Sequence, residues 1–425
     1  MGERGPQWVQ NRIFRGYGQL SLVEHALCPL DSRTSALPNL VHETSYPLMD
    51  AARHTRTARV RVFCPLGLLA QDELYLWGLL ALTLRQSDPA VEFHATPHYC
   101  LTQLGLIDAR SRRGGRQYQQ FRAAMDRLSV VRYLNDRFYD PVRAEHRQVS
   151  FGFFSYSLPA DAASKRAWRF FWDPLFFEFI RANGGGLGFD LELYRRLDPA
   201  SRRLFLLISK VFARRPEISF DLRHLAVDVM GLSASLLCRD QLAKTRRCLR
   251  RLATHNVVSR SDASCLRKHG RGQYTVTLAK GRHFDRGLTG ERAAPTVASP
   301  LHGILWEIGL DAQAIQRHLR QFSHGLLREW ADITLAARER FGDSFFKRSP
   351  AAYFVDNVKH ASQGRRTPPD WWHGIRKAEE VQRSDQLRRV LADAHFSAPV
   401  PRVAASDAGL TSARTVLARI AHPSS

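Results

Sequence analysis

Hydrophobic positions recur with helical spacing in one strongly charged stretch, residues 239–258. Four side chains suited to a packed face follow one another at intervals of three, four and three residues: Leu242, Thr245, Leu249 and Leu252. The remaining faces carry five cationic side chains: Lys244, Arg246, Arg247, Arg250 and Arg251. This spacing predicts a helix that packs through one side and exposes a positively charged side. Asn256 ends the helix, and Val257 and Val258 begin a strand.

A second stretch repeats the pattern earlier in the chain. Its packed face has the same intervals of three, four and three residues: Tyr118, Phe121, Met125 and Leu128. Its outward face is predicted to hold Arg116, Gln117 and Gln120, together with Ala124 or Arg127. Residues 130–134 are predicted to form a strand, 135–146 a polar loop, 148–156 a returning strand and 166–172 a further strand.

Each basic helix follows a longer and a shorter predicted helix. The first pair covers residues 65–85 and 97–104, and the second pair covers 199–212 and 222–230. After the second basic helix come a strand at 257–260, a loop at 261–272 and a strand at 273–279. Two copies of this order predict tandem winged helix-turn-helix domains, at residues 51–180 and 187–285.

The predicted fold class is therefore α+β and mainly helical, with two winged helix-turn-helix domains and a helical C-terminal extension. Residues 1–50 hold four prolines and no sustained period, which indicates an irregular N-terminal arm. Residues 286–300 are predicted to be a linker and residues 301–395 a helical C-terminal region. Residues 396–425 are predicted to be a disordered tail.

Composition adds the class of partner. The chain of 425 residues holds 63 Lys+Arg against 40 Asp+Glu, a formal net charge of +23. Such an excess favours a polyanion, with nucleic acid before a membrane surface. No apolar run is long enough to span a bilayer, and residues 1–10 lack the apolar core of a secretory signal. The six cysteines form no CxxC pair, which fits reduced thiols in a cytoplasmic protein.

The positive charge is concentrated on the second predicted domain. Residues 239–283 hold twelve Lys+Arg and two Asp+Glu. Lys244, Arg247 and Arg251, with Arg246 and Arg250 beside them, are predicted to reach base edges or nearby phosphates. The phosphate contacts of the second wing are predicted at Arg267, Lys268 and Arg271. The residues of the first domain that are predicted to bind DNA are Arg113, Arg116, Gln117 and Gln120. Taken singly, each of these side chains could equally be a solvated surface group.

Motifs for catalysis and cofactors are missing from the sequence. There is no GxxxxGK[ST] phosphate loop, no zinc spacing and no catalytic triad. His94 and His98 have the wrong spacing for a rolling-circle nicking enzyme, and Pro97 lies between them. Trp371 and Trp372 could stack on single-stranded nucleic acid, but core packing is favoured. The sequence therefore predicts no enzyme, no cofactor and no metal site.

Four runs resemble a known family: RAWRFFWDPLFFEF, GFDLELYRRLDPASRRLFLLISKVFARR, FDLRHLAVDVMGLS and RRCLRRLATHNVV. They are similar to bacterial, often plasmid-encoded, initiators of the replication initiator protein A group. The similarity covers roughly residues 45–285, and YRRLDPASRRLF is its most specific part. It implies two winged helices that bind repeated sites in double-stranded origin DNA. It also implies recruitment of host replication proteins, such as the helicase or its loader, without catalysis. Some members dimerise through the first domain, so a homodimer is one expectation.

Three other functions are weighed against initiation. A DNA-binding transcriptional regulator that represses its own promoter shares every DNA-binding feature and is the alternative hypothesis. A nickase would need catalytic residues that the sequence does not supply. A basic membrane-surface protein would need a wide apolar helix face with interfacial aromatics, which the charged helices lack.

Overall fold

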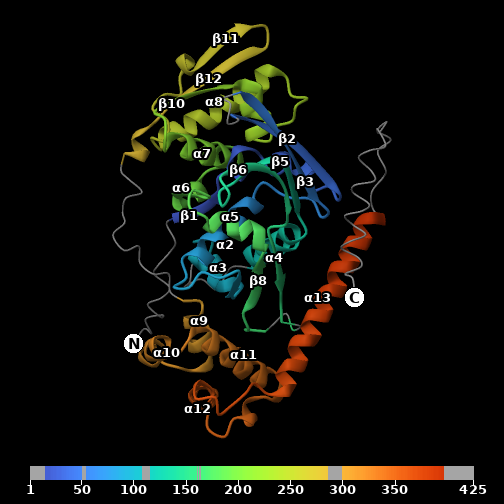
Figure 1. The fold of residues 1–425 in the computed structure, drawn as a ribbon, viewed down its shortest axis with the longest axis vertical. Coiled ribbons are helices and arrows are strands. Elements are labelled where there is room, and N and C mark those ends of the chain that lie inside the picture. The colour runs from blue at the N-terminus through green and yellow to red at the C-terminus, as the bar shows by residue number, and fades with distance from the viewer. Residues whose placement is uncertain are drawn as a thin grey trace.

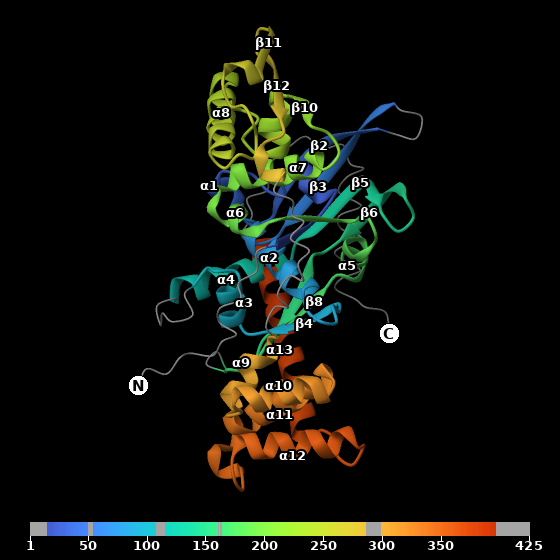
Figure 2. The same ribbon diagram turned by 90° about the vertical axis from the view of Figure 1, so that its left-hand side faces the viewer.

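The computed structural model describes residues 15–49, 54–107, 115–159, 161, 164–285 and 299–396. Within these ranges a mixed α/β body lies above a separate group of helices, and the last helix runs back along the body (Figure 1). Figure 2 shows the helical group and the β11 end at opposite ends of the long axis. No helix of the described residues is long and apolar enough to cross a membrane. All six cysteines fall in the described ranges and are free thiols.

The body contains four antiparallel sheets. Their strands are β1 (Arg15–Gln19), β2 (Leu40–Met49), β3 (Thr55–Cys64), β4 (Glu92–Ala95), β5 (Arg132–Asp140), β6 (Glu145–Phe151), β7 (Phe154–Ser157), β8 (Trp168–Trp172), β9 (Gly186–Asp190), β10 (Glu217–Asp221), β11 (Leu266–Gly270) and β12 (Gln273–Ala279). The sheet orders are β1-β9, β2-β3-β5-β6, β4-β8-β7 and β10-β12-β11.

Helices connect these sheets and form the C-terminal group. The body holds α1 (Ser32–Ser35), α2 (Asp72–Leu84), α3 (Pro97–Gln103), α4 (Gly115–Ser129), α5 (Pro174–Arg181), α6 (Leu191–Arg196), α7 (Pro199–Phe212), the π-type segment η3 (His224–Val229) and α8 (Cys238–Thr254), with the short turns η2 (Leu22–Glu24), η4 (Ala263–Cys265) and η5 (Arg282–Phe284). The C-terminal group holds α9 (Leu301–Ile308), α10 (Ala312–Gln321), α11 (His324–Phe341), η6 (Asp343–Phe345), α12 (Pro350–Ser362) and α13 (Asp370–Phe396). Apart from Phe396, which ends α13, the predicted tail lies outside the described residues, as does most of the predicted linker.

One plan of helices and strands occurs twice in the body. In the first half, α2 leads to β4, and α3 and α4 lead, after the inserted strands β5 and β6, to the β7-β8 hairpin. In the second half, α7 leads to β10, and η3 and α8 lead to the β11-β12 hairpin. Both three-stranded sheets place the last strand in the middle, as β4-β8-β7 and β10-β12-β11. The β7-β8 loop is therefore the topological counterpart of the β11-β12 turn.

The first hairpin lies further along the chain than the sequence pattern predicts. Residues 135–146 are not a polar loop, because β5 continues to Asp140 and β6 starts at Glu145. These two strands belong to the four-stranded sheet with β2 and β3. A register shift between Asn135 and Phe138 interrupts the alternation of β5, and such a bulge removes the period of two on which strand prediction depends.

The predicted irregular arm contains regular structure from Arg15 onward. β1 pairs with β9, and β2 pairs with β3 over ten residues. Pro47 lies within β2, which is an edge strand of its sheet. An edge strand tolerates proline because one side needs no ladder hydrogen bond. Pro47 therefore removed the sequence signal for a strand that is present. The part of the arm before Arg15 lies outside the described residues.

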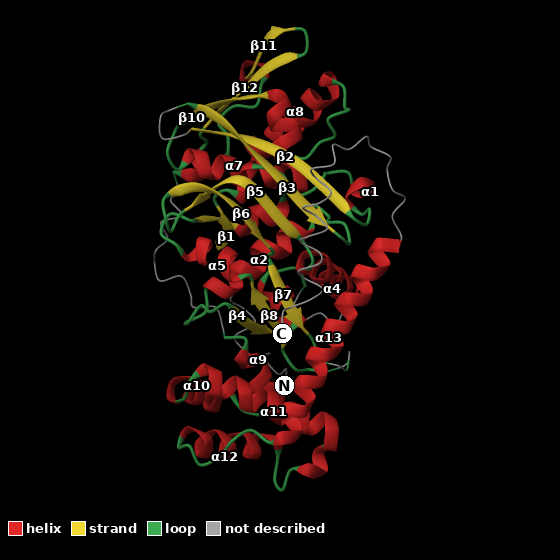
Figure 3. Cartoon of the chain, turned by 45° about the vertical axis from the view of Figure 1, so that its right-hand side comes forward, coloured by secondary structure: helices red, strands yellow, loops and turns green. Residues whose placement is uncertain are grey.

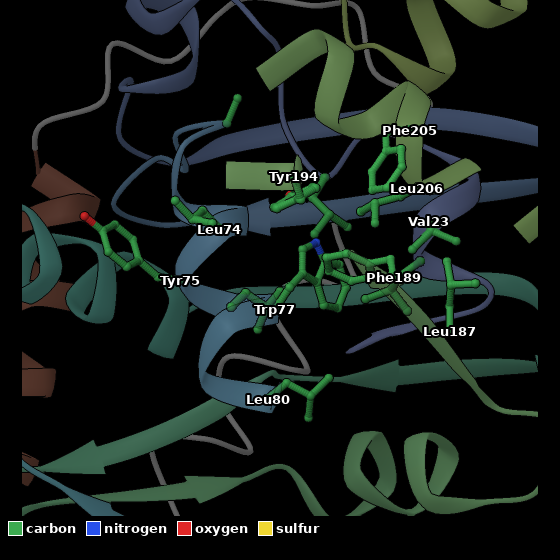
Figure 4. Packing of buried hydrophobic residues seen from close by; sticks show 14 of the residues in the cluster. Val23, Leu74, Tyr75, Trp77, Leu80, Leu187, Phe189, Tyr194, Phe205 and Leu206 are labelled. Carbon is green, nitrogen blue, oxygen red and sulfur yellow. The ribbon is translucent and has the colours of Figure 1, made fainter. Parts of the chain in front are cut away.

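The two halves share one hydrophobic core, which corrects the expectation of two separate cores. A single cluster of buried residues extends from Leu22 to Leu278. Figure 4 shows Trp77 of α2 beside Phe189 of β9 and Tyr194 of α6, with Phe205 of α7 above them. The C-terminal helices bury a second cluster of their own, from Leu301 to Trp372. The body thus behaves as one packed unit to which a second unit is joined.

The predicted packed face of α8 lies in the shared core. Thr245, Leu249 and Leu252 are fully buried, while Leu242 is partly buried. Replacing Leu249 with alanine is expected to lower the free energy of unfolding by about 2–5 kcal/mol, because it leaves a cavity at a buried leucine. Urea denaturation followed by circular dichroism measures this loss. A Leu249→Ala protein as stable as the wild type would show that α8 does not pack through this face.

A buried histidine makes the stability of the body dependent on pH. His25 lies between the rings of Tyr46 and Tyr133, and burial lowers the pKa of His25 from 6.5 to about 4. The folded state therefore binds its proton less readily than the unfolded state. Stability is full above pH 6.5 and falls as the pH drops toward 4, by about 3 kcal/mol if this group acts alone. Urea titrations at pH 7 and pH 4.5 measure the loss, and a His25→Gln variant should show a smaller one.

Candidate nucleic-acid interface

Helix α8 presents the cations that the sequence pattern placed on its outer side. Lys244, Arg247 and Arg250 are exposed, and Arg246 is partly buried. Within the part of the chain that the structure describes, none of these four side chains forms an ion pair or a side-chain hydrogen bond. An unpaired, solvated cation can contact phosphate without first breaking an internal pair. The exposed face of α8 is therefore free to meet a polyanion.

Arg251 differs from the other cations of α8. Its Nη1 lies 2.6 Å from Oδ2 of Asp198, and Asp198 also caps α7 by accepting a hydrogen bond from the Ser201 amide. Burial acts to raise the pKa of Asp198, but the Ser201 hydrogen bonds and the Arg251 charge outweigh it and lower this pKa. Arg251 thus holds α8 against the start of α7. A contact of Arg251 with a base has to compete with this pair.

The β11-β12 hairpin lies beside the start of α8. The Cys238 thiol is 3.5 Å from the carbonyl oxygen of Gly272 at the hairpin turn. Three cationic side chains of the hairpin are exposed: Arg267, Lys268 and Arg271. The cations of the helix and of the hairpin therefore belong to one end of the molecule (Figure 2).

The corresponding helix of the first half, α4, is less strongly charged. Arg116 and Gln120 are exposed, and Gln117 is partly buried. Arg113 lies outside the described residues. The start of α4 is tied to α3, because the Tyr118 hydroxyl is 2.7 Å from Nδ1 of His98.

Two residues predicted to face outward from α4 do not. Ala124 is fully buried, because it shares the face of α4 that packs on the body. Arg127 is paired with Asp72 at the start of α2, with 2.7 Å between Nε and Oδ2. The Asp72 side chain is almost fully buried, so this pair fixes α4 on α2 rather than offering a charge to a ligand.

Of the two tryptophans considered as stacking platforms, Trp371 is partly buried and packs against the second cluster. Trp372 is 9% exposed and donates from Nε1 to Asp332. The described residues contain no group of three or more His, Cys, Asp or Glu side chains that could hold a metal ion.

Comparison with known proteins gives a limited likeness. No family model matches the chain, and no curated protein matches it in sequence. Two solved structures of domains 2 and 3 of the protein RctB are similar to it, at 15% and 14% sequence identity and TM-scores of 0.39 and 0.37. Each similarity covers 61% of this chain, and 98% or 96% of the RctB chain. The sequence likeness to the replication initiator protein A group stays a resemblance.

Proposed function

We propose that the chain is a replication initiator that binds double-stranded DNA at repeated origin sites through two winged helix-turn-helix domains. The observation that carries the proposal is the exposed, unpaired row of Lys244, Arg247 and Arg250 on α8, beside the cationic β11-β12 hairpin. A helix of this size fits the major groove, and an adjacent hairpin can grip the backbone. The resemblance of YRRLDPASRRLF and its neighbouring runs to initiators supports replication as the purpose of this binding.

The repeated plan of the body supports the domain assignment. A helix, a strand, two helical segments and a hairpin follow in the order of a winged helix in the second half, and the first half has the same order with β5 and β6 inserted before the hairpin. In this proposal α8 is the reading helix of the second domain and α4 that of the first. The β11-β12 hairpin is the second wing. The protein would act in the cytoplasm, at an origin that the family resemblance places on a plasmid. Once bound there, it would recruit the host helicase or its loader.

Footprinting on the DNA that flanks the gene tests the proposal. We expect protection of short direct repeats, because a reading helix would occupy each repeat. DNA without any protected repeat would contradict the proposal. A replication assay with a minimal origin then separates an initiator from a transcriptional regulator, since a regulator would bind the repeats without supporting replication.

The proposal includes no catalysis by the chain itself. Incubation with supercoiled DNA and magnesium should therefore leave the DNA supercoiled. Relaxed product would identify a nicking activity instead.

A further inference from the structure

Acidic side chains of the C-terminal helices contact the β7-β8 loop of the first half. Its counterpart, the β11-β12 turn, exposes its cations to solvent. The two loops occupy equivalent places in sheets of the same order. If the second is a wing that contacts DNA, the first is the wing of the other domain. The inference below rests on the proposed function.

Arg166 is the centre of this contact. Its Nε lies 2.7 Å from Oδ1 of Asp332 on α11, and its Nη1 lies 2.5 Å from Oε1 of Glu379 on α13. The arginine side chain is 3% exposed. Asp332 also accepts a hydrogen bond from Trp372 at 2.8 Å. One wing residue therefore joins two helices of the C-terminal group.

The two residues before Arg166 repeat the arrangement. Nζ of Lys165 lies 2.5 Å from Oε1 of Glu307 on α9. The Ser164 hydroxyl donates to Oε1 of Glu339 on α11 at 2.7 Å. Each of these partners is a carboxylate, and carboxylates and phosphates are bound by the same lysine and arginine geometry. The acidic groups of the C-terminal helices thus take the contacts that a DNA backbone would make.

Charge pairs hold this junction, with little apolar packing. The buried clusters of the body and of the C-terminal helices are separate, and Ala167 is a partly buried residue of the body that packs against the second cluster. A pocket of about 490 Å³ remains at the junction, with Arg169, Arg328 and Glu329 in its lining. Polar interfaces of this kind between parts of one chain allow the parts to separate.

Helix α13 brings a further part of the C-terminal group next to the first half. This helix packs against β7 and then runs along the body on the side of α4 (Figure 3). The C-terminal group therefore lies next to both DNA-facing elements of the first domain. The second domain, at the other end of the molecule, has no such cover from the described helices.

We propose that the C-terminal helical unit, residues 299–396, is an autoinhibitory clamp on the first domain. Its carboxylates compete with DNA phosphates for the β7-β8 loop. In the clamped state only the second domain binds a duplex. Release of the unit adds the first domain to the contact.

The test compares full-length proteins that differ only in carboxylates of the C-terminal unit. The variant Glu307→Gln/Glu339→Gln removes two charges that contact the loop and leaves Arg166 paired, so the fold is expected to remain intact. The matched control, Asp343→Asn/Glu380→Gln, removes two exposed charges of the same unit that do not contact the loop. A third variant, Asp332→Asn, weakens the buried contact directly. Thermal unfolding checks that all three are folded.

Fluorescence anisotropy with a duplex that carries the footprinted repeats gives the first readout. The clamp variant should bind about tenfold more tightly than the wild type, within the 5–150-fold range usual for coupling between sites. The control should match the wild type. Equal affinities for the clamp variant and the control would overturn the clamp.

Hydrogen exchange of the amides at residues 164–168 gives the second readout. Exchange should be faster in the Asp332→Asn variant than in the wild type, and added DNA should slow it again. If the loop of the Asp332→Asn variant exchanges no faster than that of the wild type, or if added DNA does not slow its exchange, the clamp is wrong. If Arg247→Ala weakens binding while no clamp variant gains affinity, the clamp fails and the proposed DNA binding through α8 stands. If none of the proteins binds any duplex, both proposals fail.

Discussion

The double variant Lys244→Ala/Arg247→Ala is expected to lose most of its affinity for the repeat duplex. Each residue that touches a base contributes about 1–3 kcal/mol, so the pair should cost about 2–6 kcal/mol if the two contacts are independent. Both side chains are exposed and form no ion pair within the described residues, so their removal should leave the fold unchanged. Anisotropy titrations over a series of salt concentrations measure the loss, and the salt dependence should become less steep if phosphate contacts are lost.

A matched control removes two cations from elsewhere on the surface. Arg317→Ala/Arg320→Ala makes the same change of charge on exposed positions of α10 and should bind the duplex like the wild type. Equal losses in the two variants would mean that only net charge matters. A loss that is uniform for repeat and scrambled duplexes would place Lys244 and Arg247 on phosphates and not on bases. Arg251→Ala should have a smaller effect, because Arg251 already pairs with Asp198.

Replacing Glu73 with alanine is expected to lower the free energy of unfolding by about 3–5 kcal/mol, the usual cost of breaking a buried ion pair. Glu73 of α2 pairs with Arg203 of α7 at 2.6 Å, and the two side chains are 5% and 4% exposed. Arg203 also donates to the carbonyl oxygen of Met230 at 3.0 Å. Without the carboxylate, the guanidinium stays buried with no opposite charge. Urea denaturation measures the change.

Two comparisons separate charge from packing at this site. The double variant Glu73→Ala/Arg203→Met should recover part of the stability, because it removes the stranded charge as well. The Glu192→Ala variant breaks an exposed pair with Arg196 and should cost no more than about 1 kcal/mol. A Glu73→Ala protein as stable as the Glu192→Ala protein would contradict the view that this pair ties the two halves together.

The parts of the fold that the sequence predicted are those with a local period. The stripe of Thr245, Leu249 and Leu252 specifies α8 and its buried side without help from distant residues. The same pattern predicted α4, although Ala124 of this helix, which was expected to face outward, is buried. Exposed cations on α8 follow directly from this geometry, because the positions opposite a packed stripe face solvent.

Contacts between distant segments could not be predicted in this way. The Arg251 pair with Asp198 spans 53 residues, and the Arg166 pair with Glu379 spans 213. A single sequence carries no local trace of such pairs. The aspartate that pairs with Arg251 was visible as a helix start before Pro199, but nothing near it indicates which cation it would meet. The single core of the two halves has the same cause, because a local period carries no information on contacts between the halves.

The single core beneath the two halves has a consequence for the DNA that such a protein can use. Since Trp77, Phe189 and Phe205 pack in one cluster, α4 and α8 cannot move apart as they could in two domains joined by a flexible linker. A duplex engaged by both has to offer its contact segments at one separation and one rotational phase. Half a helical turn, about five base pairs, inserted between those segments would carry one of them to the far side of the double helix.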